Sequence, residues 1–507
     1  MNGTATLERH PRGLYILFGT EMWERFSFYT VNAMLSLYLR DNVQGFNFTN
    51  AHSASVVSTY NMFVYFTPLL GGLLADLLLG FRKAIMIGAV FFIAGHALLA
   101  VPNSLTIVYA ALACLVLGNG LFKPNVSSMV GNLYREGSHL KDKAYLIFYM
   151  GINIGAFGAP LLANFIQPRW GFHPAFFMGA IGMIISLTVF VLNQKHVRHA
   201  DRIRGKVDAK AVAVTEDLPP VSEEARLIEA VPEWKRIAAL IVIFLIVIVF
   251  WMVFHQNSIS LTFWANDHSR KLPGILSNAI NPLYIILLSL PLAGFWSWLD
   301  KKGREPSTPV KIMIGMLLTG FSFVILFFAA RSGGFTAPVF KVVKSDANQT
   351  WVSISPEARE HLGINTAGTK IDAKTDGWLV SGAGGVPVGE YVRLESRSGE
   401  AISVAPVNRV SAWWLILAYG VLSLGELMLS PMGLSLVSKV APIRMRGVMM
   451  GGWFAATAIG NKLTGVAKYW DLWSHANFFI ILASMALIMA VVLFVLLRPL
   501  KRAMPGV

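Results

Sequence analysis

The sequence predicts an all-α protein that crosses a membrane many times, and three observations lead to this prediction. Of its 507 residues, 55% are hydrophobic and only 14% are charged, whereas soluble domains carry about 25% charged residues. The apolar residues form long uncharged runs, including 84–122, 237–253 and 478–497. Such runs reach the roughly 20 residues that a helix needs to cross a bilayer. The basic residues lie in short loops between these runs.

Twelve spans are predicted in chain order from the length and hydropathy of the apolar runs. Their approximate ranges are 12–40, 52–79, 83–101, 104–131, 142–166, 173–194, 236–265, 274–299, 308–330, 411–438, 446–469 and 474–498. An even number of spans places both termini on the same side of the membrane.

The distribution of Lys and Arg among the loops predicts which side that is. Basic residues occupy alternate loops, namely 82–83, 135–143, 195–236, 301–311 and 439–446, and the C-terminal segment continues the series. The opposite loops at 102–103 and 470–473 contain no Lys or Arg. Because basic loops stay in the cytoplasm, we expect both termini to be cytoplasmic.

The chain divides into two six-helix halves, residues 12–194 and residues 236–498. Between them, the polar and highly charged segment 195–235 is expected to be a flexible cytoplasmic linker. Inside the C-terminal half, residues 331–410 are polar and contain short runs of β-forming residues between Gly- and Pro-rich turns. We therefore expect a small, mostly β extracytoplasmic insert between the ninth and tenth spans.

Composition also excludes several classes of function. The net charge of +15 lies in membrane-flanking loops, so nucleic-acid binding is not expected. Cys114 is the only cysteine, so neither a disulfide nor a cysteine metal site can form within the chain. The sequence contains no phosphate-binding loop, metal-ligand cluster or nucleophile motif, so we expect no enzyme activity, no cofactor and no metal. The segment 1–11 lacks the apolar core of a signal peptide.

Charged residues inside two of the spans are the most informative feature. Glu21, Glu24 and Arg25 follow the spacing i, i+3 and i+4, which places them on one face of the first helix. A charge at the centre of a bilayer costs about 2.5–3.5 kcal/mol, so it normally faces a cavity or a partner. Two acids and one base leave a carboxylate that can bind and release a proton. Lys123 in the fourth span could neutralise one acid or hold the carboxylate of a substrate; the alternative is a purely structural ion pair.

Several motifs resemble known membrane transporters. Residues 71–83, GGLLADLLLGFRK, resemble the loop motif of the major facilitator superfamily, whose acid and bases pair near helix ends. Residues 21–29, EMWERFSFY, read E-x-x-E-R-F-x-F-Y and resemble the E-x-x-E-R-F-x-Y-Y signature of the proton-coupled oligopeptide transporter family. Residues 148–157, FYMGINIGAF, are similar to its F-Y-x-x-I-N-x-G-S-L segment. The Lys-Pro at 123–124, the Asn-Pro at 281–282 and the Gly-Glu-Leu at 425–427 also fit.

This resemblance implies a major facilitator fold and a proton-coupled symporter that imports di- and tripeptides by alternating access. It implies a proton-coupling cluster of Glu21, Glu24, Arg25 and Lys123. The implied substrate-binding residues are Tyr29, Tyr60, Lys123, Tyr149, Asn153, Asn281, Glu426 for the peptide amino terminus, and Trp453 near the cavity. A zwitterionic peptide needs a cation for one end and an anion for the other, which Arg25 or Lys123 and Glu426 would supply.

Three positions depart from the family pattern. Phe28 replaces the first tyrosine of the signature, which removes one hydroxyl. Asn32 stands where many relatives carry a second arginine, and we keep it as a substrate-binding candidate. His255 stands where relatives often have an acid, so it is a candidate proton or gating site, with hydrogen-bonded packing as the alternative. For His96, in the apolar third span, packing is the expected role.

The expected partners are small peptides, protons and the lipid bilayer, and we expect a monomer. The expected location is the cell membrane, in a bacterial inner membrane, as a multi-pass protein. One alternative function is proton-coupled transport of another small anion or zwitterion. A second is a membrane nutrient sensor in which residues 331–410 bind the ligand, although a sensor has no need for a titrating cavity.

Overall fold

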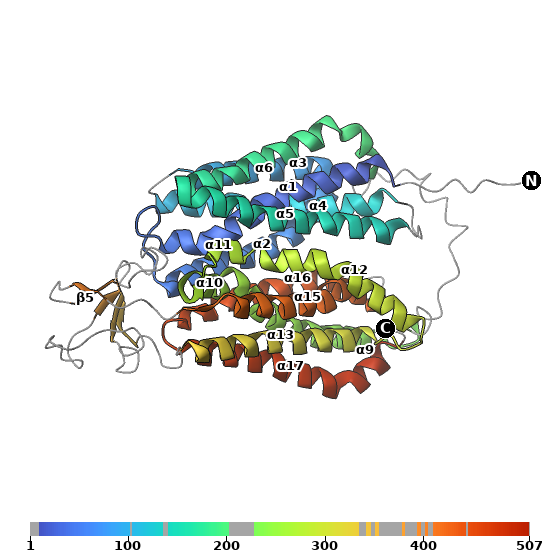
Figure 1. Ribbon diagram of the computed structural model, residues 1–507. Helices are drawn as coiled ribbons and strands as arrows, with labels where there is room; N and C mark the ends of the chain where they lie inside the picture. The colour runs from blue at the N-terminus through green and yellow to red at the C-terminus, as the bar shows by residue number, and fades with distance from the viewer. Residues whose placement is uncertain are drawn as a thin grey trace, which may run out of the picture.

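A computed structural model gives the structure of the chain. The structure describes residues 10–101, 104–134, 140–201, 228–333, 341–345, 350–353, 378–380, 393–396, 401–403, 409–442 and 445–505. Long helices lie side by side along one direction, and the first helix begins at the same end of this bundle at which the last helix ends (Figure 1). Short strands lie beyond its opposite end, which we call the insert end.

The N-terminal half contains six long helices. They are α1 (Arg12–Arg40), α2 (Asn50–Leu74), α3 (Phe81–Leu99), α4 (Leu105–Asn132), α5 (Leu140–Trp170) and α6 (Phe172–Leu192). The side chains of Thr49 and Ser104 accept hydrogen bonds from the first turns of α2 and α4, which fixes where these helices begin. A π-helical turn, η1 (Ala75–Leu79), extends α2. Gly80 follows at a φ of 76°, a conformation that favours glycine, and α3 begins directly after it.

Two short 3₁₀ turns follow α6, namely η2 (Gln194–His196) and η3 (Arg198–Ala200). They pack against the N-terminal half through Arg82, whose guanidinium donates to Gln194 and whose backbone N–H donates to Asp201. The loop motif was expected to pair its own acid with its bases. Within the described residues, Asp76 takes part in no ion pair, and Arg82 is instead held by the segment after α6.

The C-terminal half contains helices at the remaining predicted spans. They are α9 (Glu233–Phe254), η4 (His255–Ser258), α10 (Ser260–His268), α11 (Gly274–Ser277), α12 (Ile280–Asp300), α13 (Thr308–Ser332), α15 (Trp413–Val440), α16 (Arg446–Leu463), η6 (Thr464–Tyr469) and α17 (His475–Ala503). The predicted span 236–265 is therefore not one continuous helix. It is interrupted by a 3₁₀ turn where the polar sequence His255–Ser258 occurs.

The strands lie next to and within residues 331–410. A two-residue strand β1 (Ser269–Arg270) pairs in parallel with β7 (Val410–Ser411). Five further strands form an antiparallel sheet in the order β2-β3-β4-β5-β6; they are β2 (Lys341–Ser345), β3 (Thr350–Ser353), β4 (Trp378–Val380), β5 (Arg393–Ser396) and β6 (Ala401–Ser403). The rest of this stretch lies outside the described residues, and the insert as a module of its own stays a prediction.

Length and hydropathy identify the helices that can cross a membrane. Among the described residues, ten helical segments meet both requirements, and neither α1 nor α16 is among them. Helix α1 carries the three buried charges of the first span, which lower its hydropathy. A multi-pass membrane protein is therefore supported, and the count of twelve crossings stays a prediction.

The two halves contact each other along two seams. Helix α2 packs against α16 and η6, and α5 packs against α11 and α12. Polar contacts between described side chains also cross between the halves. They include Arg40 Nη2 to Asp267 Oδ2 at 2.8 Å, Asn50 Nδ2 to Asp471 Oδ1 at 2.8 Å, and Lys462 Nζ to Thr59 Oγ1 at 2.5 Å. The first two involve residues at the ends of helices beside the β1–β7 pair, so the halves are joined at the insert end.

Candidate functional site

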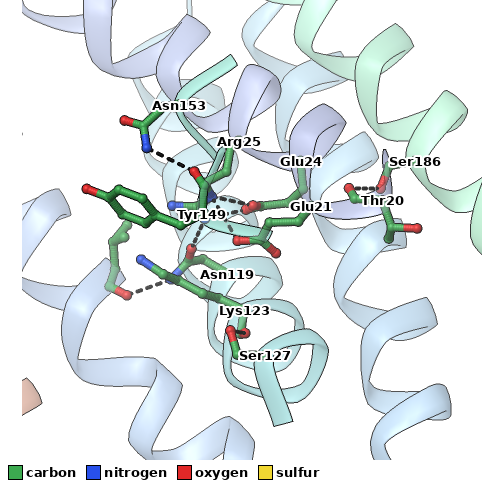
Figure 2. Close-up of polar contacts among 11 residues, drawn as sticks. Thr20, Glu21, Glu24, Arg25, Asn119, Lys123, Ser127, Tyr149, Asn153 and Ser186 are labelled. Atoms are coloured by element: carbon green, nitrogen blue, oxygen red, sulfur yellow. Dashed lines mark hydrogen bonds and ion pairs between the residues drawn. The ribbon is translucent and has the colours of Figure 1, made fainter. Parts of the chain in front are cut away.

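A buried charge cluster centres on Arg25 of α1. Its Nε donates to Glu24 Oε2 at 2.5 Å and its Nη2 donates to Glu24 Oε1 at 2.6 Å. The same Nη2 also donates to Asn119 Oδ1 of α4 at 3.0 Å. Figure 2 shows the side chains of Glu21, Glu24, Arg25 and Asn119 gathered in one place between helices. A bidentate pair of this kind is strong and holds both side chains in a defined geometry.

Glu21 is the second acid of the cluster, and its position differs from that of Glu24. Its Oε1 lies 3.6 Å from Arg25 Nε, too far for a good hydrogen bond. Glu21 is fully buried, and neither of its oxygens has a hydrogen-bond partner among the described residues. An ionised carboxylate that is buried with so little compensation is costly. The cluster therefore contains one acid that is satisfied by Arg25 and one acid that is suited to carry a proton.

Lys123 lies one helical turn after Asn119 on α4. Its Nζ stands 5.0 Å from the centroid of the Tyr65 ring, a cation–π contact between α4 and α2. Within the described residues, Lys123 makes no ion pair, although it lies within electrostatic reach of Glu21 and Glu24. Both roles expected for Lys123, neutralising one of these acids and holding the carboxylate of a substrate, therefore stay predictions. Its ammonium is placed to accept another anion.

The C-terminal half contributes an acid on α15. Asn281 of α12 donates its Nδ2 to Glu426 Oε2 at 2.9 Å and to Ser423 Oγ at 2.9 Å. Glu426 is half-buried, and none of the ion pairs in the described part of the chain involves it. The carboxylate is therefore oriented by an amide and keeps its charge available for a cation.

Three tyrosines of the N-terminal half lie between these two charged groups. Tyr29 of α1, Tyr65 of α2 and Tyr149 of α5 are each within electrostatic reach of Glu426, and Tyr29 and Tyr65 are also within reach of Arg25. Polar groups that are separated by up to about 400 residues in the sequence are thus brought to one region between the halves. Phenolic hydroxyls there can orient a substrate by donating or accepting hydrogen bonds.

His255 lies in η4, at the break in the seventh predicted span. Its ring stacks on Trp251 with centroids 4.9 Å apart, and it approaches Tyr65 of the other half at 5.4 Å. Next to it, Gln256 donates to the backbone oxygen of Thr464 at 3.2 Å and so ties η4 to η6. His255 is therefore part of the surface at which the halves meet. Its ring contacts Tyr65, the tyrosine that Lys123 also contacts.

The remaining predicted residues occupy less polar surroundings. Tyr60 is almost fully buried and lies within electrostatic reach of Arg25. Asn153 donates to the backbone oxygen of Tyr149 at 2.9 Å, and Asn32 has a buried Oδ1 with no partner among the described residues. Trp453 is 3% exposed.

Trp453 packs inside the C-terminal half. Its ring lies against Phe244 of α9, with centroids 6.2 Å apart and nearly perpendicular planes. It also fills the space above Gly433 of α15, where a Cβ would lie 1.8 Å from the ring. These contacts give Trp453 a packing role that joins α9, α15 and α16, and a role in lining the cavity stays a prediction.

Sequence reasoning missed three residues of this region. Asn119 fixes Arg25, Tyr65 contacts both Lys123 and His255, and Ser423 holds Asn281. Asn119 could have been found, because it lies four residues before Lys123 and so shares its helix face. Tyr65 and Ser423 gave no such signal, since each contacts residues on other helices.

The chemistry of the site is that of binding. In the segments that the structure describes, no group of three or more His, Cys, Asp or Glu side chains could hold a metal ion. The site instead offers cations in one half, an acid in the other, and hydroxyls and amides near both. Such an arrangement can hold a molecule with opposite charges at its two ends and can take up a proton at Glu21.

The chain is similar along most of its length to known membrane transporters. In Bacillus subtilis (strain 168), the uncharacterized transporter YclF is 28% identical, with 98% of this chain and 96% of the relative covered. The di-/tripeptide transporter of Lactococcus lactis subsp. lactis (strain IL1403) is 28% identical, with 98% of this chain and 97% of the relative covered. A solved POT family transporter in complex with a thioalcohol-conjugated peptide has a TM-score of 0.74 at 25% identity, with 97% of both chains covered.

A family model described as the POT family (PTR2) matches residues 82–216, 220–361 and 389–474, which is most of the chain. The matched stretches include parts of both halves and several of the motifs found in the sequence, among them the Lys-Pro at 123–124 and the Gly-Glu-Leu at 425–427, while the signature at 21–29 lies before the first of them. The chain therefore belongs to the POT family of proton-coupled transporters in the major facilitator superfamily.

Proposed function

We propose that this chain is a proton-coupled symporter that imports small peptides by alternating access of two six-helix halves. The observation that carries the proposal is the separation of charge across the site. Arg25 and Lys123 belong to the N-terminal half and Glu426 belongs to the C-terminal half. A peptide zwitterion whose carboxylate binds Lys123 and whose amino group binds Glu426 would draw the two halves together. Two relatives that are named or solved as peptide transporters support this choice of cargo.

Proton coupling is assigned to Glu21, Glu24, Arg25 and Lys123, with His255 beside them. Glu24 neutralises Arg25 through two hydrogen bonds, whereas Glu21 lacks a donor. Protonation of the Glu21/Glu24 cluster weakens the Glu24–Arg25 pair and removes negative charge near Lys123, so both cations are then available for the peptide carboxylate. Proton release to the cytoplasm restores the Glu24–Arg25 pair and expels the substrate. His255 would respond to the protonation of this cluster through Tyr65, because His255 and Lys123 both contact that ring.

The remaining site residues act as supports of the peptide. Tyr29, Tyr60, Tyr149, Asn32, Asn153 and Asn281 are proposed to line the pocket, and Trp453 to support it from behind. We further propose a monomer with twelve crossings and with both termini and residues 195–235 in the cytoplasm. With that orientation the insert end faces outward, and the polar contacts across it describe a transporter closed to the outside.

The experiment that tests the function is uptake of labelled dialanine into proteoliposomes, with and without an inward proton gradient. We expect uptake that the gradient stimulates and that unlabelled di- and tripeptides abolish by competition. A proton-permeable liposome, obtained with a protonophore, is the control for the driving force. Binding-competent protein that takes up no peptide under any gradient would contradict the proposal.

One observation favours a second cargo. Asn32 carries no charge where many relatives place a cation, and its Oδ1 lacks a partner in the described structure. A pocket with one cation fewer holds a carboxylate less firmly, which permits a different small anion or zwitterion. If dialanine fails, a screen of small anions and zwitterions by thermal stabilisation of the purified protein separates this possibility from an inactive preparation.

A further inference from the structure

An amide and a carboxyl group meet between the halves at the insert end. Asn50 is the first residue of α2 and is 5% exposed. Its Nδ2 donates to Asp471 Oδ1 at 2.8 Å. Asp471 belongs to the short connection between η6 and α17, so this contact joins the N-terminal half to the C-terminal half outside the spans. It can exist only while the halves are closed at this end.

The contact is incomplete in one respect. Asn50 Oδ1 is buried and has no hydrogen-bond donor among the described residues. An ionised carboxylate has only acceptors, so Asp471 in that form can satisfy the amide nitrogen and leaves the amide oxygen unpaired. A buried acceptor without a donor costs about 1–3 kcal/mol. A protonated carboxyl carries an O–H that can donate to Asn50 Oδ1, which completes a reciprocal pair.

Other charged groups face this contact from the neighbouring elements. On one side lies the ion pair of Arg40, at the end of α1, with Asp267 of α10. Burial raises the pKa of Asp471 to about 6, and Asp267 acts in the same direction, while the Asn50 hydrogen bond and Arg40 oppose them. His268 of α10 and His475 of α17 lie beyond Trp470. Arg40 pairs with Asp267, and its charge lowers the pKa of Asp471 by less than burial raises it.

From this geometry we propose that Asp471 and Asn50 form an external proton-binding site that stabilises closure of the insert end. The proton bound here is distinct from the one that moves with the substrate. It enters from the side that the insert end faces, and it returns to that side when the halves separate. Its effect is to make an acidic exterior favour the closed state. The proposal depends on the alternating-access part of the proposed function but not on the identity of the cargo.

The direction of the effect follows from linkage. Asp471 is partly exposed in the closed state. When the halves separate it becomes more fully exposed to water, and its pKa returns toward the ordinary value of about 3.9. The pKa of about 6 belongs to the closed state, so proton binding favours closure. Above about pH 6 the site is ionised in both states and contributes nothing to the pH dependence. Between about pH 6 and pH 4, each unit of acidification favours closure by up to tenfold.

The test measures opening of the insert end by labelling a cysteine with a membrane-impermeant maleimide. Cys114 is first replaced, as Cys114→Ala, so that no other thiol is present. Ser58→Cys then reports opening, because Ser58 is 1% exposed and lies 3.1 Å from the position of a Cβ on Gly465 of η6, in the other half. Val43→Cys, at a site that is 80% exposed, corrects for the effect of pH on thiol reactivity itself.

Labelling is measured on the full-length protein in proteoliposomes, with the external pH varied from 4 to 8. We expect the labelling rate of Ser58→Cys, relative to Val43→Cys, to fall several-fold as the pH falls below about 6. In an added Asp471→Asn variant, the relative rate should be low and independent of pH, because the new amide can donate to Asn50 Oδ1 as the protonated acid would. A flat profile with native Asp471, or an unchanged slope in Asp471→Asn, overturns the proposal.

Asp267→Asn is the matched control. It removes an acid from the same end of the protein and breaks the ion pair with Arg40. We expect it to raise labelling and to move the acid-dependent decrease to lower pH, because Asp267 raises the pKa of Asp471 and Arg40, released from its ion pair, lowers it. A decrease that stays at the same pH in Asp267→Asn would show that the titrating group does not sense these two charges and is not Asp471. The readout needs no peptide, so a failure of dialanine uptake leaves this test unaffected, and a pH-independent Ser58→Cys leaves the transport proposal unaffected.

Discussion

Glu24 and Arg25 are adjacent in the sequence, and their side chains form two hydrogen bonds of 2.5 and 2.6 Å inside the N-terminal half. Adjacent residues on a helix point in different directions, so this pairing requires both long side chains to bend toward each other. The guanidinium is then occupied by Glu24 and Asn119, and Glu21 is left without a hydrogen-bond donor in the described structure. Glu24 is therefore hydrogen-bonded to Arg25 and Glu21 is not, a difference that the sequence alone does not indicate.

The first prediction concerns Glu24→Gln. The amide cannot neutralise Arg25, so protonation no longer changes how firmly the guanidinium is held. We expect gradient-driven uptake of dialanine to fall at least tenfold, equivalent to about 1.4 kcal/mol, while exchange of labelled for unlabelled peptide without a gradient persists. Measurement of both rates in the same proteoliposomes checks this. Glu305→Gln, which alters a partly exposed pair with Lys311, is the matched control, and intact acid-driven uptake in Glu24→Gln contradicts the coupling role.

The second prediction concerns Glu426→Gln and the amino terminus of the peptide. The substitution keeps the size of the side chain and its contact with Asn281 but removes the negative charge. Because a charge-assisted hydrogen bond is stronger than a neutral one, we expect dialanine to bind about tenfold or more weakly. N-acetyl-dialanine has no amino charge, so its affinity should change little. Competition against labelled substrate measures both constants.

Ser423→Ala is the control for this substitution, since it removes a neutral partner of Asn281 without changing the charge of the site. It should weaken binding of both ligands slightly and to the same extent. Equal losses of dialanine and N-acetyl-dialanine in Glu426→Gln would show that the acid does not recognise the amino group.

The helices and the charged residues of the site were predictable because a short stretch of sequence is enough to identify each of them, by its hydropathy or by a charge within an apolar run. Hydropathy and charge located the segment 12–40, and the structure gives α1 as Arg12–Arg40. The interruption at His255–Ser258 was not predicted, since a few polar residues among many apolar ones do not alter an averaged hydropathy. Its contact with the other half depends on the ring of His255 reaching Tyr65 of α2, which no local pattern records.

The contacts between the halves were not predictable. Asn50 and Asp471 are 421 positions apart, and Arg40 and Asp267 are 227 apart. Both pairs exist only in a conformation that is closed at the insert end. An alternating-access protein adopts several conformations with one sequence, so the sequence does not indicate which residue pairs are in contact in the same conformation. The same reason explains why Lys123 was expected beside the acids and is found over Tyr65.

The third prediction is that His96 is a structural residue. Its Nδ1 faces the backbone oxygen of Phe176 at 3.2 Å, and its Nε2 lies 2.5 Å from Ser27 Oγ. The carbonyl requires Nδ1 to donate, so Nε2 accepts from the serine, and the ring joins α3, α6 and α1. His96→Leu should lower the free energy of unfolding by about 1–3 kcal/mol, because Ser27 and the carbonyl lose their partner.

Thermal unfolding of the purified protein measures this loss, and the pH dependence of uptake provides the second readout. A structural histidine leaves the midpoint of that pH profile unchanged, even if the amount of active protein falls. Ser27→Ala, which removes one of the two contacts, should give a smaller loss of stability. A shifted pH profile in His96→Leu would instead assign the residue to proton transfer.

The last prediction concerns the contact between Trp453 and Gly433. A Cβ at position 433 would lie 1.8 Å from the indole ring, which is already held by Phe244. Gly433→Ala should therefore force the ring to move and lower the free energy of unfolding by about 1–3 kcal/mol. Gly294→Ala, where an added Cβ meets nothing within 4 Å, is the matched control and should be close to neutral. Adding Trp453→Phe to Gly433→Ala frees space beside α15, so the two losses should be less than additive in a double-mutant cycle. Strict additivity would show that the ring does not pack on Gly433 in the membrane.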